Sequence, residues 1–174
     1  MNIDQVTTAV KVGQFVINPN RNTKARLKVM WEDLGKEVLK DNAGRVYLMV
    51  VNGVIKKIGG SVSKGGIKST MSFYESGNCG RPSIRSFGIQ QLIFEELCMD
   101  NVVEIYIITS QRVLAPVQGL FGNEEIPISA FKEMEEKCIA DFVKIEDNHP
   151  EWNYQEAGKP WEGYIQEAHA ALLS

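Results

Sequence analysis

Histidines, cysteines and long apolar runs are all scarce in this 174-residue chain. The only two histidines, His149 and His169, stand far apart, which argues against a zinc site. The three cysteines are odd in number and form no Cys-x-x-Cys pair, so we expect reduced thiols and a cytoplasmic protein. No apolar run approaches the roughly 20 residues that a membrane helix needs, and no secretion signal opens the chain. We therefore expect no membrane contact.

Size and charge fit one globular domain with a locally basic segment. The hydrophobic fraction is 44%, the charged fraction is 24%, and the net charge is −3. Residues 45–85 nevertheless contain seven basic side chains against one acid, Glu75, whereas residues 122–174 contain twelve acids against four lysines. A basic region within an acidic chain predicts a polyanionic partner. The alternative is an ordinary solvated charged surface.

Hydrophobic periodicity and turn residues predict an α+β fold, with a small antiparallel or mixed central sheet built on a β-hairpin and flanked by helices. Residues 116–128 contain two prolines and two glycines and are predicted to be irregular. We interpret residues 1–174 as a single domain with a core at about 45–153, a strand-helix extension at 1–44 and a C-terminal helix at 160–173. The predicted elements are strand Val10–Ile17, helix Thr23–Leu39, a hairpin around Asn52-Gly53, helices Ile67–Glu75 and Ser83–Met99, strand Val102–Thr109, and helices Ala130–Val143 and Trp161–Leu173.

The most informative stretch is residues 45–60, where two β-branched runs flank Asn52-Gly53, a strong hairpin signal. A strict two-residue turn would place Tyr47 opposite Ile58 and point Lys57 to the other face of the sheet. A type I turn with Gly53 in a bulge would bring Tyr47 and Lys57 to one face, and this is our prediction. Without a bulge, Lys56 becomes the better candidate.

Glu135 is an anomaly in the helix predicted at residues 130–143. At 100° per residue it falls on the same face as Phe131, Cys138 and Phe142. A buried carboxylate is costly unless it is paired or bound to a metal, so Glu135 is a salt-bridge partner, a metal ligand or a residue at an exposed end of the apolar face. As a hard oxygen donor it suits Mg²⁺, which often takes one protein carboxylate together with water and phosphate oxygens.

The order of the hairpin, the basic helix and the later glutamate along residues 45–153 resembles the motif order of the GIY-YIG nuclease superfamily. Val46-Tyr47-Leu48 resembles the first motif and Lys57-Ile58-Gly59 the second. By the same resemblance, Lys68 stands at the place of the family's basic residue. The remaining assignments are Tyr74 as the further catalytic residue, Glu135 as the metal ligand and Asn153 as a supporting residue.

Three departures from the family pattern qualify these assignments. Lys57 replaces the tyrosine of the second motif, a change that the resemblance to small type II restriction endonucleases of the superfamily makes tolerable. Lys68 replaces the usual arginine and cannot offer a bidentate fork to phosphate, so Arg81 or Arg85 are alternatives. Tyr74 lies two residues further from Lys68 than the family spacing.

The resemblance implies a DNA endonuclease with one Mg²⁺ per active site, and a sequence-specific type II restriction enzyme is our first interpretation. Because both strands must be cut, we expect a homodimer on double-stranded DNA. The alternatives are a nicking or repair nuclease of the same superfamily and a noncatalytic nucleic-acid-binding module. Candidate DNA contacts are Lys24, Arg26 and Lys28 of the predicted N-terminal helix, together with Lys56, Lys64, Arg81 and Arg85.

Overall fold

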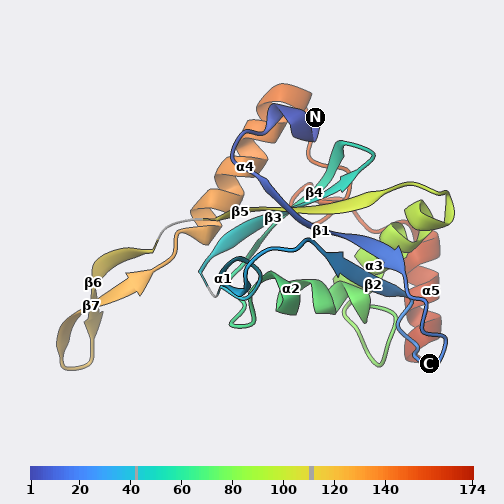
Figure 1. Cartoon of the computed structure of the whole chain (residues 1–174), viewed down its shortest axis with the longest axis horizontal. Coiled ribbons are helices and arrows are strands. Elements are labelled where there is room, and N and C mark those ends of the chain that lie inside the picture. The colour runs from blue at the N-terminus through green and yellow to red at the C-terminus, as the bar shows by residue number, and fades with distance from the viewer. Residues whose placement is uncertain (42, 110–111) are drawn as a thin grey trace.

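The computed structural model describes residues 1–41, 43–109 and 112–174, and its centre is one five-stranded antiparallel sheet. Its strands are β1 (Val10–Ile17), β2 (Leu27–Trp31), β3 (Arg45–Val51), β4 (Val54–Ser61) and β5 (Val103–Thr109). They lie in the order β2-β1-β5-β3-β4 (Figure 1), so the hairpin of β3 and β4 ends the sheet and leaves β4 at an edge. The predicted α+β class is confirmed.

The predicted hairpin is present, but its irregularity lies elsewhere than we expected. Val51 pairs with Val54, so Asn52 and Gly53 form a two-residue turn, with φ values of 46° and 84° that suit this turn. The register shifts further along, because Met49 pairs with Lys57 and Val50 with Ile55. Lys56 is therefore the bulged residue, and the prediction of a bulge at Gly53 was wrong.

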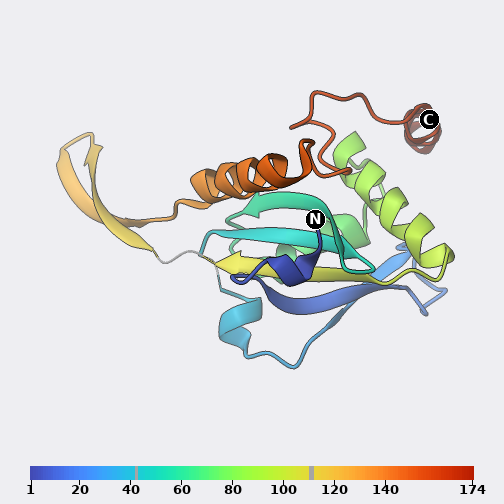
Figure 2. The same ribbon diagram turned by 90° about the horizontal axis from the view of Figure 1, so that it is seen from above.

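Helices and the N-terminal segment cover both faces of the sheet (Figure 2). On one face, side chains of the strands pack against α1 (Lys36–Leu39), α2 (Gly66–Glu75) and α3 (Ile84–Cys98). On the other, Leu48 and Ile58 pack with Phe142 of α4 (Phe131–Glu146) and with Ile3 of a short 3-10 turn, η1 (Ile3–Gln5). The C-terminal helix α5 (Gly163–Leu173) lies beside α3.

The α3 start illustrates how local sequence sets these elements. Ser83 has extended backbone dihedrals, and its hydroxyl accepts a hydrogen bond from the Ser86 amide at 3.2 Å. This N-cap satisfies an amide that has no partner within the helix. The predicted helices at residues 67–75, 83–99, 130–143 and 161–173 are all confirmed to within a few residues.

Two predicted segments were wrong. Residues 23–39 are not one helix but a loop, strand β2 and the single turn α1. Residues 116–128 are not irregular, because β6 (Val113–Gly119) and β7 (Gly122–Ile128) pair as a second, two-stranded sheet. This hairpin extends away from the rest of the molecule (Figures 1 and 2). Both prolines fit because each strand of a two-stranded sheet has a free edge.

Across the described residues, no helix combines the length and apolar character that crossing a membrane requires.

Candidate active site

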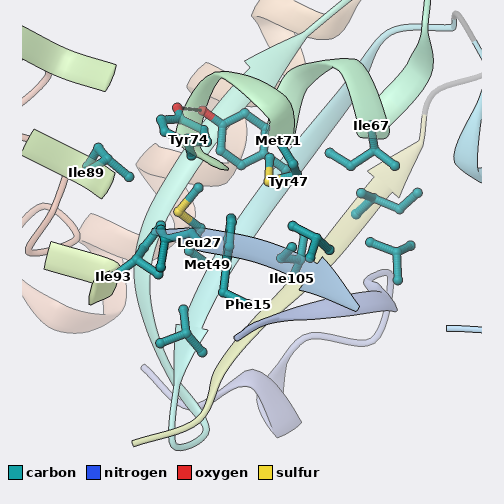
Figure 3. Packing of buried hydrophobic residues seen from close by; sticks show 14 of the residues in the cluster. Phe15, Leu27, Tyr47, Met49, Ile67, Met71, Tyr74, Ile89, Ile93 and Ile105 are labelled. Atoms are coloured by element: carbon teal, nitrogen blue, oxygen red, sulfur yellow. Dashed lines mark hydrogen bonds between the residues drawn. The ribbon is translucent and has the colours of Figure 1, made fainter. Parts of the chain in front are cut away.

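Two tyrosines meet beneath a surface pocket. Tyr47 of β3 and Tyr74 of α2 are nearly fully buried, and their phenolic oxygens lie 2.6 Å apart (Figure 3). Burial raises the pKa of Tyr47 well above its usual value, with smaller contributions from Tyr74 and Glu135. Burial likewise raises the pKa of Tyr74, although its hydrogen bond to Tyr47 and the Arg85 charge oppose the shift. Both phenols therefore stay protonated near neutral pH.

Lys57 lies on the same face of the sheet as Tyr47. Met49 pairs with Lys57 and Tyr47 pairs with Gly59, and paired residues of an antiparallel sheet project to the same side. The Lys57 side chain is only 1% exposed. Burial, followed by the nearby Arg85 charge, lowers the pKa of Lys57 to about 8. A lysine in this state supplies a neutral amine far more readily than an ordinary one.

Arg85, near the start of α3, supplies a guanidinium to this pocket. The pocket has a volume of about 250 Å³, and Arg85 lines it together with Tyr47, Gly60, Ser61, Thr70 and Tyr74. On its other side the guanidinium donates a hydrogen bond to Gln155 at 3.2 Å and lies 3.6 Å from the Glu156 carboxylate. Arg85 is thus held in place while its side chain stays 37% exposed to solvent.

Glu135 reaches the same region from α4, on the opposite face of the sheet. A Cβ built at Gly60 would lie 2.5 Å from Oε2 of Glu135, and one at Gly59 would collide with the Tyr47 ring. The two adjacent glycines of the edge strand therefore let an acid and a phenol approach one short segment from two sides. The Glu135 charge acts on the pKa values of Tyr47, Lys57 and Arg85.

Asn153 holds the edge of β4. Its side chain is fully buried, its Oδ1 accepts from the Ile58 amide at 2.9 Å, and its Nδ2 donates to the Ile58 carbonyl at 2.8 Å. The Trp152 amide also donates to the Lys56 carbonyl at 2.8 Å. This segment completes the hydrogen bonds of the edge strand that carries Lys57, Gly59 and Gly60.

Several other candidates lie outside this cluster. Lys68 of α2 sits over the Trp31 ring, with its Nζ 5.4 Å from the ring centroid, and Lys56 pairs with Glu151. Lys64 and Arg81 are exposed on the loops before and after α2. Lys24, Arg26 and Lys28 do not form the expected basic helix, because they lie in a loop and in β2.

The donor set limits the kind of metal that this site could hold. Within the described residues, no three His, Cys, Asp or Glu side chains are arranged to bind a metal ion. Glu135 alone, with its carboxylate close to the pocket-lining Gly60, fits a Mg²⁺ ion that takes one carboxylate and completes its shell with water and phosphate oxygens. The same donor set does not fit zinc, which needs three or four protein ligands.

Comparison with solved structures identifies the fold. EndoII of bacteriophage T4, solved as a mutant, superposes with a TM-score of 0.55 at 14% identity, over 88% of this chain and 98% of the other. Restriction endonuclease HPY188I, solved with product DNA, superposes with a TM-score of 0.53 at 19% identity, over 86% of this chain and 84% of the other. The chain shares its fold with these two endonucleases. No family model and no curated protein matches the sequence.

Sequence reasoning undervalued two features of this fold. Arg85 was, with Arg81, only an alternative to Lys68, because Lys68 stands at the place of the family's basic residue. The role of Gly60 was missed, although the Gly59-Gly60 pair inside a strand was a usable signal for close approach of other groups.

Proposed function

We propose that this protein is a Mg²⁺-dependent DNA endonuclease that hydrolyses phosphodiester bonds. The observation that carries the proposal is the gathering of Tyr47, Lys57, Arg85 and Glu135 around the Gly59-Gly60 end of β4. A proton acceptor, a cation and an acid are the groups that phosphodiester hydrolysis needs. The endonuclease-like fold supports the same reaction class.

Tyr47 and Lys57 would activate the attacking water. Tyr47 lines the pocket, but its raised pKa makes a free phenolate unfavourable. Lys57 is buried on the same face with a pKa of about 8, which lies close to the pH at which such enzymes work. In this proposal the Tyr47 oxygen takes a proton from water as its own proton moves toward the neutral Lys57 amine.

Arg85 would stabilise the charge that grows on the phosphate oxygens during attack. Its guanidinium lines the pocket and is already oriented by Gln155 and Glu156, so little rearrangement is needed in the transition state. A guanidinium also offers the bidentate geometry that Lys68 lacks. Arg85 therefore takes the role that the sequence motif assigned to Lys68.

Glu135 would hold the Mg²⁺ ion. When bound, Mg²⁺ supplies positive charge that neutralises the leaving oxygen of the phosphodiester. The glycine at position 60, which lines the pocket, leaves room for the Glu135 carboxylate beside it. The acidic residue therefore serves as a ligand rather than as a base.

The biological role that we favour is sequence-specific restriction of double-stranded DNA by a homodimer. HPY188I is named as a restriction endonuclease, and its structure contains product DNA, which supports this choice. A nicking or repair nuclease is the second candidate, because one chain carries one site and a monomer cuts one strand. A noncatalytic binding module is less favoured, because binding alone does not require a lysine with a lowered pKa such as Lys57.

Incubation of plasmid DNA with the protein and Mg²⁺ tests this function. Discrete fragments indicate restriction, nicked circles indicate the second candidate, and unchanged plasmid contradicts both. Glu135→Gln should abolish cleavage and leave DNA binding in a gel-shift assay within a few-fold of the wild type. The matched control is Glu133→Gln on the same helix, whose exposed carboxylate should be dispensable.

A further inference from the structure

The hairpin of β6 and β7, which we name the arm (residues 113–128), has one apolar face. Val113 pairs with Ile128, Ala115 with Ile126, and Val117 with Glu124, so these six side chains share one side of the ribbon. The opposite side carries Leu114, Pro116 and Gln118 with their partners Pro127, Glu125 and Asn123. One side of the arm is therefore mainly aliphatic, whereas the other mixes polar side chains with Leu114 and the two prolines.

The apolar face and the tip are open to solvent. Val113 is 60% exposed, and Leu120 and Phe121 at the tip are almost completely exposed. A hollow near the tip is lined by Val117, Leu120, Phe121 and Ile126, and the hairpin curves as it leaves the molecule (Figure 2). A two-stranded hairpin is marginally stable alone in water, so this surface is expected to pack against another molecule.

The charge of the arm argues against nucleic acid as the molecule that packs on its apolar face. Residues 112–128 contain Arg112 against Glu124 and Glu125, so the arm has a slight negative charge. Binding to a phosphate backbone is dominated by lysine and arginine. An apolar, slightly acidic arm is instead suited to a protein surface, whose buried centre is apolar and poor in charge.

We propose that the arm packs against a second copy of this chain in a two-fold dimer. One face of a seven-residue, two-stranded ribbon covers only about 250 Å², well below the roughly 800 Å² per partner of a stable interface. Reciprocal exchange of two arms doubles this contact, and the tip side chains extend it, because each copy gives an arm and receives one. The choice of a second copy also rests on the proposed function, since a double-strand cut needs two active sites.

Light scattering of the full-length protein at micromolar concentration tests the arm directly. We expect the wild type to have twice the mass of one chain. Ile126→Asp places a charge on the apolar face and should weaken dimerisation at least tenfold. Asn123→Asp adds the same charge to the opposite, mixed face and should leave the dimer intact. A monomeric wild type, or a dimer that persists in Ile126→Asp, overturns the proposal.

A second variant separates the interface from folding and from DNA contact. Replacing residues 113–128 by Gly-Ser-Gly removes the arm. Circular dichroism checks that the rest of this variant still folds. We expect the variant to be monomeric and to nick plasmid DNA rather than linearise it. If replacing Leu120 and Phe121 by serine weakens DNA binding while the mass stays that of a dimer, the tip contacts DNA and the proposal is wrong.

The two proposals fail separately. A dimer that depends on the arm but has no nuclease activity refutes only the proposed function. A monomer that linearises DNA refutes only the assignment of the arm.

Discussion

The phenolic oxygens of Tyr47 and Tyr74 lie 2.6 Å apart, and both nearly buried side chains line the same pocket. The two residues are 27 positions apart in the chain and come from β3 and α2. Each hydroxyl group is the buried hydrogen-bond partner of the other, so neither phenol needs to ionise to be satisfied. This arrangement makes the roles of the two hydroxyl groups separable by experiment.

Tyr47→Phe should reduce the cleavage rate by about 100-fold or more, because proton transfer by a positioned group contributes roughly 10² to 10⁴ in rate. Tyr74→Phe should act mainly on stability, since it leaves the Tyr47 hydroxyl without its buried partner. The free energy of unfolding should fall by about 1 kcal/mol, measured by urea denaturation. Equal losses of cleavage in both variants would contradict this division.

The pKa of Lys57 predicts the pH dependence of cleavage. If the neutral amine accepts the proton, kcat/KM should rise with pH, reach half of its maximum near the Lys57 pKa of about 8, and level off above it. Lys57→Met should be much slower and should lose this rise. A wild-type profile that is flat from about pH 6 to 9 would remove Lys57 from the proton path.

The lowered pKa of Lys57 also predicts how the free energy of unfolding depends on pH. The unfolded chain keeps Lys57 protonated up to its ordinary pKa of 10.5, whereas the folded chain releases that proton near a pKa of about 8. Between these values the unfolded state binds more protons, so the Lys57 contribution to the free energy of unfolding increases as the pH rises. Denaturation of Lys57→Met over this range serves as the reference without that contribution.

Arg85 and Lys68 should differ sharply when replaced. Arg85→Ala should lower kcat by about 10²- to 10³-fold, the usual effect of removing one group that stabilises transition-state charge. Lys68→Ala should change kcat little, because Lys68 lies over Trp31 rather than in the pocket. Single-turnover cleavage of a duplex oligonucleotide gives both rates. The reverse order of effects would restore Lys68 to the site.

Gly60→Ala should impair cleavage without unfolding the protein. The added Cβ would meet Oε2 of Glu135 at 2.5 Å, and this flexible carboxylate can move aside at low cost to stability. Displacement by about 1 Å is enough to lower the rate by up to about 100-fold. Gly163→Ala is the matched control because no atom lies within 4 Å of the added carbon. Equal activity in the two variants would detach Glu135 from catalysis.

Sequence reasoning succeeded where the signal was local. Asn52-Gly53 between two β-branched runs predicted the hairpin, and the Ser83 cap predicted the start of α3. It failed between residues 23 and 39, because spacings of four residues suit both a helix and a strand. Leu27, Val29 and Trp31 alternate as a strand does, and that period-two signal is what the fold uses.

The arm was missed for a related reason. Leu120 and Phe121 form its turn, and neither is a typical turn residue, while Pro116 and Pro127 discourage a strand prediction. The alternation of Val113, Ala115 and Val117 was present but faced no recognisable core. A ribbon that extends away from its own domain (Figures 1 and 2) has no packing within the domain that a sequence pattern could reveal.

The sequence by itself determined the hairpin, most helices and the presence of an acid on the apolar face of α4, because turn chemistry and hydrophobic periodicity act over a few residues. Only the tertiary structure decided that the bulge falls at Lys56, that Lys57 is buried and that Arg85 rather than Lys68 lines the pocket. These outcomes depend on how α2, α3 and α4 pack on the two faces of the sheet. Such contacts join residues far apart in the chain, and no local pattern encodes them.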